Sequence, residues 1–180
     1  MIFEATPIPG LVIVDLDMHT DERGFFARSW CAREFADAGL PDGLAQCSIS
    51  WNKSRHTLRG MHWQAAPHGE GKLVRCTGGA LLDVVVDLRA ESPTYLDHFS
   101  AELTSSNRSA LFIPAGLAHG FLTLADETEV LYQMDTPYVA EASRGVRWDD
   151  PAFAIDWPAV PAVISERDST YPDLLLESRK

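Results

Sequence analysis

The chain has 180 residues, of which 46% are hydrophobic, and it carries a formal net charge of −11. This length and this apolar content suffice for one domain with a hydrophobic core. The acidic excess argues against a protein that binds nucleic acid or an anionic membrane, both of which require a basic surface, although a few local cations suffice to hold a nucleotide diphosphate.

Short apolar segments rich in β-branched residues run along the chain, separated by Gly, Pro, Asn and Asp. This pattern predicts an antiparallel sandwich or barrel, and the lack of regularly alternating helices disfavours a parallel α/β fold. One short helix is expected at Cys31–Ala38, ended by Gly39, and a second near the C-terminus. The expected strands are Leu11–Asp17, Phe25–Trp30, Ala45–Trp51, Thr57–Gln64, Lys72–Thr77, Leu81–Leu88, His98–Leu103, Ser109–Ile113, Gly120–Leu124 and Glu129–Met134.

No repeat, low-complexity run or linker interrupts this pattern, so residues 1–180 are expected to form a single all-β domain. Residues 1–14 lack the features of a secretory signal, and no stretch approaches the roughly 20 apolar residues of a membrane span. The cysteines, Cys31, Cys47 and Cys76, are odd in number and widely spaced, which fits a reducing compartment better than disulfides or a zinc site. We therefore expect a cytoplasmic protein.

The segment LLDVVVDLR is apolar at three successive positions, Val84, Val85 and Val86. Such a strand is covered on both faces, as in the inner sheet of a jelly roll. Asp83 and Asp87 share one face with Val85, because side chains alternate along a strand. Each carboxylate is expected to pair with a nearby arginine or a backbone amide.

The segment TLRGMHWQ, Thr57–Gln64, contains the most informative histidine. Alternation along a strand places His62 and Gly60 on one face and Arg59 on the other. An imidazole on an inward face is costly to bury unless its nitrogens are paired. Taken alone, such a histidine is usually structural.

Four further residues point to chemistry beside His62. Lys72 begins a strand after a Gly-containing turn, where its ammonium group either leaves through the rim or faces an anion, and His119 follows a Pro–Gly turn. Tyr132 lies in the segment EVLYQMDTPY, and Asp168 lies in ISERD, from which a carboxylate can return to support a histidine. A base, a cation, a phenol and a carboxylate are the parts needed to remove a proton beside a carbonyl and return it to the opposite face.

With these motifs the chain resembles the dTDP-4-dehydrorhamnose 3,5-epimerases, a family of cupin-type jelly rolls. The resemblance runs through DERGFF, LRGMHWQ, GKLVRC, DVVVDLR, SPT, IPAGLAHGF, LYQ, RGVRWDDPAFAIDWP and SERD. Each motif alone is weak, but their common order is specific. The resemblance implies a cofactor-independent isomerase that epimerises C3 and C5 of a nucleoside-diphosphate 4-keto-6-deoxyhexose.

The resemblance also implies roles for individual residues. His62 matches the catalytic base, Asp168 the aspartate that pairs with it, and Lys72 the lysine that stabilises the enolate at the C4 oxygen. Tyr132 matches the tyrosine proposed as the acid on the opposite face. The matched substrate-binding residues are Arg59 at the diphosphate, His119 and Gln46 in the sugar pocket, and Arg23 and Tyr138 at the nucleotide end, with Phe26 near Arg23 in DERGFF.

The match of Arg59 conflicts with alternation, because alternation turns Arg59 away from His62. Either the strand twists or bulges there, or the match is wrong.

The chain departs from the family pattern at the nucleotide end. Positions that hold Phe and Glu near the thymine in many members are His19 and Arg28 here, the familiar QDN reads Gln46-Cys47-Ser48, and the stretch from Gln46 to Arg59 is one residue longer. A CDP- or other NDP-linked sugar and an epimerase acting at C5 or C3 only therefore stay open. A sugar-nucleotide 3,4-ketoisomerase and a non-catalytic carbohydrate-binding cupin are further alternatives.

Metal-binding cupins usually offer a His-x-His pair, a nearby Glu and a later His. Here Trp63 and Gln64 follow His62, so His62 and His119 leave too few ligands, and no metal is expected. The resemblance implies a homodimer that exchanges N-terminal strands, with DERGFF completing the partner's site. The expected ligand is a nucleotide sugar, with no nucleic-acid or membrane partner.

Overall fold

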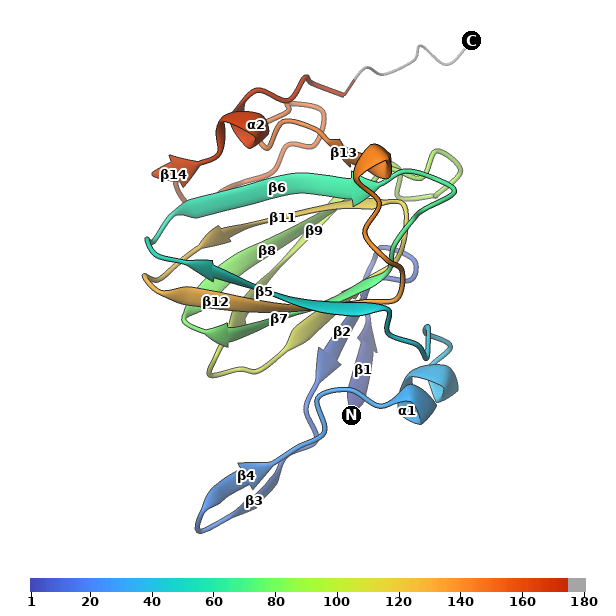
Figure 1. The fold of residues 1–180 in the computed structure, drawn as a ribbon, viewed down its shortest axis with the longest axis vertical. Coiled ribbons are helices and arrows are strands. Elements are labelled where there is room, and N and C mark those ends of the chain that lie inside the picture. Colours follow the sequence, from blue (N-terminus) through green and yellow to red (C-terminus); the bar gives the residue numbers. More distant parts are fainter. Residues whose placement is uncertain (175–180) are drawn as a thin grey trace.

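The computed structural model describes residues 1–174, which form two facing β-sheets, a separate hairpin and two short α-helices (Figure 1). The helices are α1 (Ala32–Asp37) and α2 (Glu166–Ser169), with a 3₁₀ turn, η1 (Ala140–Ala142). The strands are β1 (Ile2–Ala5), β2 (Val12–Asp15), β3 (His19–Asp21), β4 (Gly24–Phe26), β5 (Gln46–Asn52), β6 (Thr57–Gln64), β7 (Lys72–Gly78), β8 (Ala80–Asp87), β9 (His98–Thr104), β10 (Ala110–Ile113), β11 (Leu117–Thr123), β12 (Thr128–Met134), β13 (Ser143–Gly145) and β14 (Val163–Ile164).

The two sheets enclose the main hydrophobic core. One sheet has the order β1-β2-β10-β7-β12-β5, and the other has the order β13-β6-β11-β8-β9, with β14 added to β6. Val74, Leu111 and Val130 of the first sheet pack against Val85 and Phe121 of the second. All pairs are antiparallel except β14 with β6, so the predicted jelly-roll barrel is confirmed.

The strand containing Val84, Val85 and Val86 is covered on both faces, as predicted. Val85 belongs to the core between the sheets, whereas Val84 and Val86 belong to a second cluster with Phe153 on the outer face. Pairing of Asp87 with an arginine is also confirmed, because Asp87 Oδ2 lies 2.8 Å from Nη2 of Arg89. Burial alone would raise the pKa of Asp87, but hydrogen bonds from Arg89 and from nearby hydroxyl groups lower it to about 2.

The N-terminal third differs most from the prediction. No strand covers Phe25–Trp30; instead β3 and β4 form a hairpin, and β1, which was not predicted, pairs with β2. The helix expected at Cys31–Ala38 is present as α1, and Gly39 follows it with a positive φ of 73°. Within residues 1–174, no helix has both the length and the apolar character that a membrane crossing requires.

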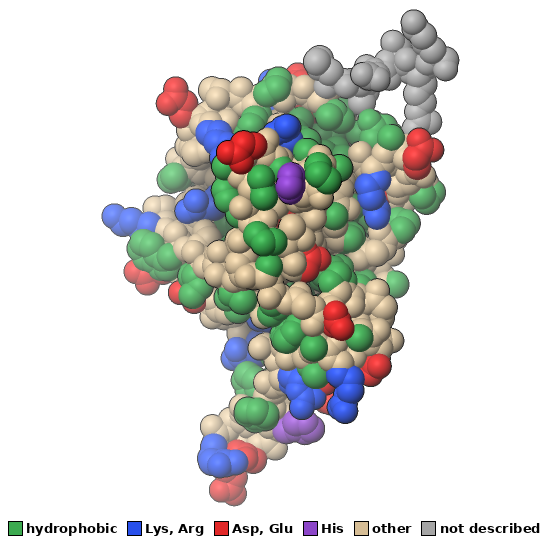
Figure 2. Space-filling model, turned by 45° about the vertical axis from the view of Figure 1, so that its right-hand side comes forward, with side chains coloured by type: hydrophobic (Ala, Val, Ile, Leu, Met, Phe, Trp, Pro, Cys, Tyr) green, Lys and Arg blue, Asp and Glu red, His purple; other side chains and the backbone are tan. Residues whose placement is uncertain are grey.

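The hairpin of β3 and β4 stands away from the barrel (Figures 1 and 2). Its outer end presents charged and hydrophobic side chains to solvent, and Phe26 is 77% exposed. Strands β3 and β4 are too short to form a stable unit by themselves. The hairpin is therefore an arm whose Phe26 side chain is left uncovered by its own chain, whereas the Phe25 ring is contacted by the Arg108 guanidinium, 4.5 Å from its centroid.

A β-bulge in β6 corrects the alternation argument. His119 pairs with His62, and Phe121 pairs with Arg59, so one residue of β11 faces two residues of β6, Gly60 and Met61. The extra residue shifts the alternation, and Arg59 and His62 both line the same cavity. The prediction that they lie on opposite faces is wrong, because it assumed an unbroken period of two.

Candidate active site

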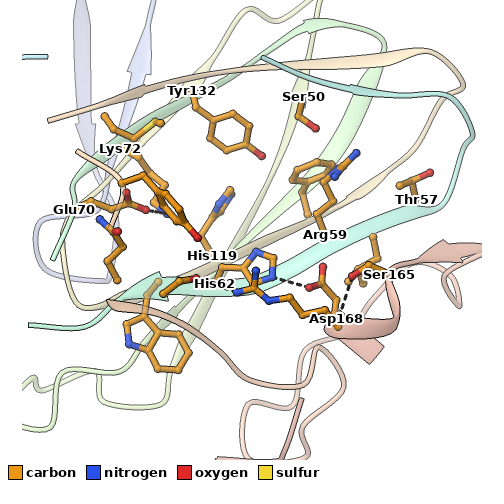
Figure 3. Close-up of a pocket in the computed structure, with 18 of the residues that line it drawn as sticks. Ser50, Thr57, Arg59, His62, Glu70, Lys72, His119, Tyr132, Ser165 and Asp168 are labelled. Carbon is orange, nitrogen blue, oxygen red and sulfur yellow. Dashed lines mark hydrogen bonds and ion pairs between the residues drawn. The ribbon is translucent and has the colours of Figure 1, made fainter. Parts of the chain in front are cut away.

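A cavity of about 640 Å³ opens between the two sheets beside the C-terminal segment (Figure 3). Its walls come from β5, β6, β7, β11 and β12, with β13, β14 and α2 along one side. The ionisable and hydrogen-bonding side chains that line it include Gln46, Arg59, His62, Glu70, Lys72, His119, Tyr132, Tyr138, Arg167 and Asp168.

His62 and Asp168 form the central polar pair. Oδ1 of Asp168 lies 2.8 Å from Nε2 of His62, and the other carboxylate oxygen accepts a hydrogen bond from the Gly60 amide at 3.1 Å. Burial alone would raise the pKa of Asp168, but these hydrogen bonds outweigh it and hold the pKa below its usual range. The carboxylate therefore accepts a hydrogen bond from the Nε2–H group of His62. In the neutral ring, Nδ1 is then the nitrogen with a free lone pair.

Asp168 reaches His62 because the C-terminal segment returns to β6. Strand β14 pairs in parallel with β6, aligning Val163 with Thr57 and Ile164 with Leu58. Ser165 then caps α2, its side chain accepting from the Asp168 amide at 3.0 Å. The pairing of β14 with β6 and the Ser165 cap thus fix the position of the Asp168 carboxylate, which is 106 residues from His62 in the sequence.

Tyr171 packs beside this pair. Its ring centroid lies 5.9 Å from that of His62 in an edge-on arrangement, and a Cβ on Gly145 would lie only 2.2 Å from the Tyr171 ring. Gly145 is therefore needed for the ring to approach β13. The aromatic contact restricts one side of the imidazole.

Lys72 enters the cavity from the first residue of β7. Its Nζ lies 2.8 Å from Oε1 of Glu70, and the two side chains are only 9% and 12% exposed. Of the two outcomes allowed by the sequence, exit through the rim or contact with an anion, the structure shows the second. The anion in this structure is a protein carboxylate that was not predicted.

Tyr132 and His119 lie deeper, on strands of opposite sheets, with ring centroids 6.2 Å apart. Burial strongly raises the pKa of the Tyr132 phenol, and the nearby charge of Asp83 raises it further. Tyr132 is therefore protonated at neutral pH. Nε2 of His119 lies 2.7 Å from Oδ1 of Asp83, although the alignment of the two groups is not that of a hydrogen bond. Asp83 is thus paired with a histidine, not with the arginine or amide that was predicted.

Two guanidinium groups lie at the cavity wall. Nε of Arg59 donates to Oδ1 of Asn52 at 2.7 Å, and Arg167 donates to the hydroxyl groups of Tyr171 and Ser143. Within the described part of the chain, neither guanidinium forms an ion pair with a carboxylate. Their positive charge is available to an anionic ligand.

The structure brings together eight of the ten residues predicted from the sequence and leaves two apart. Arg23 and Phe26 lie on the hairpin of β3 and β4 and do not line the cavity. The Arg23 guanidinium is instead paired with Asp21, and its side chain is 90% exposed. The predicted residues that do line it are His62, Lys72, Tyr132, Asp168, Gln46, Arg59, His119 and Tyr138.

Sequence reasoning missed several polar residues of the site, above all Glu70 and Arg167. Each is close to a predicted residue, Glu70 to Lys72 and Arg167 to Asp168, which was the available signal. Asn52 and Tyr171 had no local signal, because their contacts depend on pairing between distant segments. Among residues 1–174, no group of three His, Cys, Asp or Glu side chains is arranged to hold a metal ion.

Comparison with known proteins gives consistent matches along the chain. A family model described as dTDP-4-dehydrorhamnose 3,5-epimerase matches residues 5–175. A dTDP-4-dehydrorhamnose 3,5-epimerase of Sinorhizobium fredii is 43% identical over 179 residues, covering 97% of this chain and 90% of that protein.

Two solved structures show the fold of similar proteins and the ligands bound to them. A dTDP-6-deoxy-D-glucose-3,5-epimerase of Legionella pneumophila, in complex with dTDP-4-keto-L-rhamnose, has a TM-score of 0.89 and 33% identity, covering 95% of this chain and 91% of that one. A 3′-monoepimerase of Streptomyces bikiniensis, in complex with dTDP-quinovose, has a TM-score of 0.87 and 30% identity, covering 93% and 85%.

Proposed function

The chain belongs to the dTDP-4-dehydrorhamnose 3,5-epimerase family, and we propose that the cavity lined by His62 and Lys72 is its active site. The enzyme is an isomerase that acts on a sugar nucleotide, epimerising C3 and C5 of a dTDP-linked 4-keto-6-deoxyhexose. One observation supports the assignment of the site above all others: a carboxylate-supported imidazole and an ammonium group line one cavity.

His62 is the proposed base. Asp168 accepts a hydrogen bond from the Nε2–H group of His62, and this bond orients the ring. It also stabilises the imidazolium that forms when Nδ1 takes a proton from the carbon beside the ketone. The His62 side chain is 36% exposed, whereas that of Asp168 is 6% exposed, so the imidazole is open to the cavity and its supporting carboxylate is not.

Lys72 and Tyr132 complete the proposed reaction. The Lys72 ammonium stabilises the negative charge that develops on the C4 oxygen as the proton leaves. Tyr132 extends from β12 in one sheet, and His62 from β6 in the other, so the two residues approach the cavity from opposite walls (Figure 3). This arrangement suits removal of a proton from one face and its return to the other, which inverts the carbon.

Arg59 and Arg167 are the proposed diphosphate ligands. Their guanidinium groups suit phosphate oxygens, and Asn52 and Tyr171 hold them at the wall of the cavity. Gln46, His119 and Tyr138 remain predicted substrate contacts.

At the nucleotide end of the site, two of the predicted residues, Arg23 and Phe26, are missing from the cavity of their own chain. We propose that Arg23 and Phe26 reach a nucleotide bound by a second copy of the chain, which makes the enzyme a homodimer with exchanged N-terminal arms. The separation of the hairpin from its own barrel and the exposure of Phe26 support this. We further propose that the enzyme acts in the cytoplasm, in the synthesis of a dTDP-rhamnose-type sugar.

A single-centre epimerase is the second candidate function. The similarity to a 3′-monoepimerase favours it, because the same family and fold include a protein that acts at one centre. The ligands named for the solved relatives favour a dTDP-linked sugar over a CDP-linked one.

Proton NMR in deuterated water, with dTDP- and CDP-4-keto-6-deoxyglucose, tests the function. We expect deuterium at both C3 and C5 of the dTDP sugar, and a loss of about 10²- to 10⁴-fold in His62→Asn, because a general base contributes that much. Deuterium at one carbon would identify a single-centre epimerase, and a moved keto group a ketoisomerase. The proposal is wrong if His62→Asn exchanges at the wild-type rate or if no substrate exchanges.

A further inference from the structure

Glu70 is a largely buried acid in the cavity, and the proposed reaction has no use for it. Its Oε1 atom lies 2.8 Å from Nζ of Lys72, and its side chain is 12% exposed. We propose that Glu70 is a positioning residue that holds the Lys72 ammonium in place to stabilise the enolate oxygen. This inference rests on the proposed function and adds to it a residue on which the chemistry depends.

The backbone on both sides of Glu70 is anchored. The Gly71 amide donates to Oδ1 of Asp135 at 2.8 Å, and the Asp135 amide donates back to the Gly71 carbonyl at 3.0 Å. On the other side, Nε2 of Gln64 donates to the His68 carbonyl at 3.1 Å. The loop from β6 to β7 is thus tied to the ends of β6 and β12, and the Glu70 side chain starts from a fixed position.

The anchored loop also lies close to its neighbour beside Glu70. A Cβ at Gly71 would lie 2.4 Å from Oδ2 of Asp135. A larger residue there would displace the carboxylate that accepts from the amide of residue 71. The sequence GEGK therefore combines an acid, the glycine that fixes its loop, and the lysine that it contacts.

Lysine needs such a partner more than most residues. Its ammonium group is a point charge at the end of a flexible stem, so ordering it costs rotamer entropy, and burying it without a counter-charge is unfavourable. Glu70 provides the counter-charge, with Oε1 2.8 Å from Nζ. The ammonium is thereby held in place to donate to a developing oxyanion, whose stabilisation requires donors that are already positioned.

The alternative role for Glu70 is direct contact with the substrate through a sugar hydroxyl group. The two roles differ in their kinetic effect. Loss of a substrate contact made equally in the ground and transition states raises KM, whereas loss of Lys72 positioning lowers kcat. The split between kcat and KM therefore separates the two roles.

The experiment compares wild type with Glu70→Ala, Glu70→Gln, Lys72→Ala and the Lys72→Ala/Glu70→Ala double variant. We expect Glu70→Ala to lower kcat by about 10- to 100-fold, since small misplacements of catalytic groups cost up to that much, with KM within about twofold. Glu70→Gln should recover part of the loss, because the amide keeps a polar oxygen beside Nζ. In the Lys72→Ala background, Glu70→Ala should change the rate by less than about twofold, as expected for residues acting through one contact.

Glu91→Gln is the matched control, since Glu91 is exposed in the loop between β8 and β9 and lies outside the cavity. Thermal unfolding of every variant separates a kinetic effect from misfolding. The inference is overturned if Glu70→Ala keeps wild-type kcat, if only KM changes, or if the losses in the double variant are additive.

A second measurement tests positioning without any turnover. A lysine ammonium held in a buried ion pair exchanges its protons slowly, so the ¹⁵Nζ signal of Lys72 should be visible by NMR in wild type and lost in Glu70→Ala. Absence of that signal in wild type would overturn the inference even if the enzyme is active. Its presence in a protein that exchanges no substrate proton would instead overturn the proposed function alone.

Discussion

At the scale of residues, the environment gives each side chain of the site its chemical state. The carboxylate of Asp168 is kept charged by hydrogen bonds from His62 and Gly60, despite its burial. The phenol of Tyr132 is kept neutral by burial, which raises its pKa. One site thus contains a charged acceptor beside the proposed base and a protonated phenol on the opposite wall.

Tyr132→Phe is expected to separate proton removal from inversion. The variant keeps the ring and loses only the hydroxyl group, so His62 can still take a proton and return deuterium to the same face. NMR should therefore show deuterium incorporation without the epimerised product, with inversion reduced by about 10²-fold or more.

Tyr95→Phe is the control for removing a phenol, because Tyr95 lies between β8 and β9 and does not line the cavity. Inversion at the wild-type rate in Tyr132→Phe would exclude the phenol as the acid.

At the scale of elements, the bulge in β6 decides the composition of the site. It places Arg59 and His62 on one face and supplies the Gly60 amide that donates to Asp168. Gly60 has a φ of 131°, and a Cβ there would lie 2.5 Å from the Cα of Gly120 on β11. Both the backbone conformation and the close approach of the strands require glycine.

Gly60→Ala is expected to lower the free energy of unfolding by about 2–4 kcal/mol, because it combines an unfavourable φ with a steric clash against backbone. Chemical denaturation measures this loss, and activity should fall with it as the backbone shift moves the amide of residue 60 away from Asp168. Gly43→Ala is the control, since nothing lies within 4 Å of a Cβ at that position and its φ is not positive. Equal stability of the two variants would contradict this account of the bulge.

At the scale of the whole molecule, segments far apart in sequence complete the site, while the hairpin remains outside it. The C-terminal segment lies along β6, whereas β3 and β4 extend away from the barrel (Figure 1). Exposed apolar side chains on the hairpin and on β5, including Phe26, Ile49 and Trp51, remain uncovered. A second copy of the chain is the partner that we expect to cover them.

Analytical ultracentrifugation should therefore show twice the chain mass of 19.9 kDa for the wild type. Phe26→Ser should weaken this association by about tenfold or more, since burial of a phenylalanine side chain contributes about 1.5–3 kcal/mol. Val160→Ser is the matched control, because Val160 is 81% exposed and lies far along the chain from the hairpin. A wild-type monomer at micromolar concentration would contradict the predicted dimer.

The sequence by itself determined the fold class and eight of the residues that line the cavity. Alternating and continuous apolar segments predict sheets, because the residues of a strand decide which of its faces can be buried. The strand that contains Val84–Val86 is apolar at successive positions, and all three side chains are buried. The motifs around His62, Lys72 and Asp168 predicted the chemistry that we propose for this site.

Only the tertiary structure decided how these groups meet. The shift of Arg59 to the side of His62 arises from the bulge opposite Gly120 on another strand. The partner of Lys72 is set by a loop anchored at Asp135, and the position of Arg23 depends on a hairpin that stands away from its own barrel. Each of these depends on contacts between segments distant in sequence. A periodicity of two residues describes one strand and contains no information about the register of its neighbours.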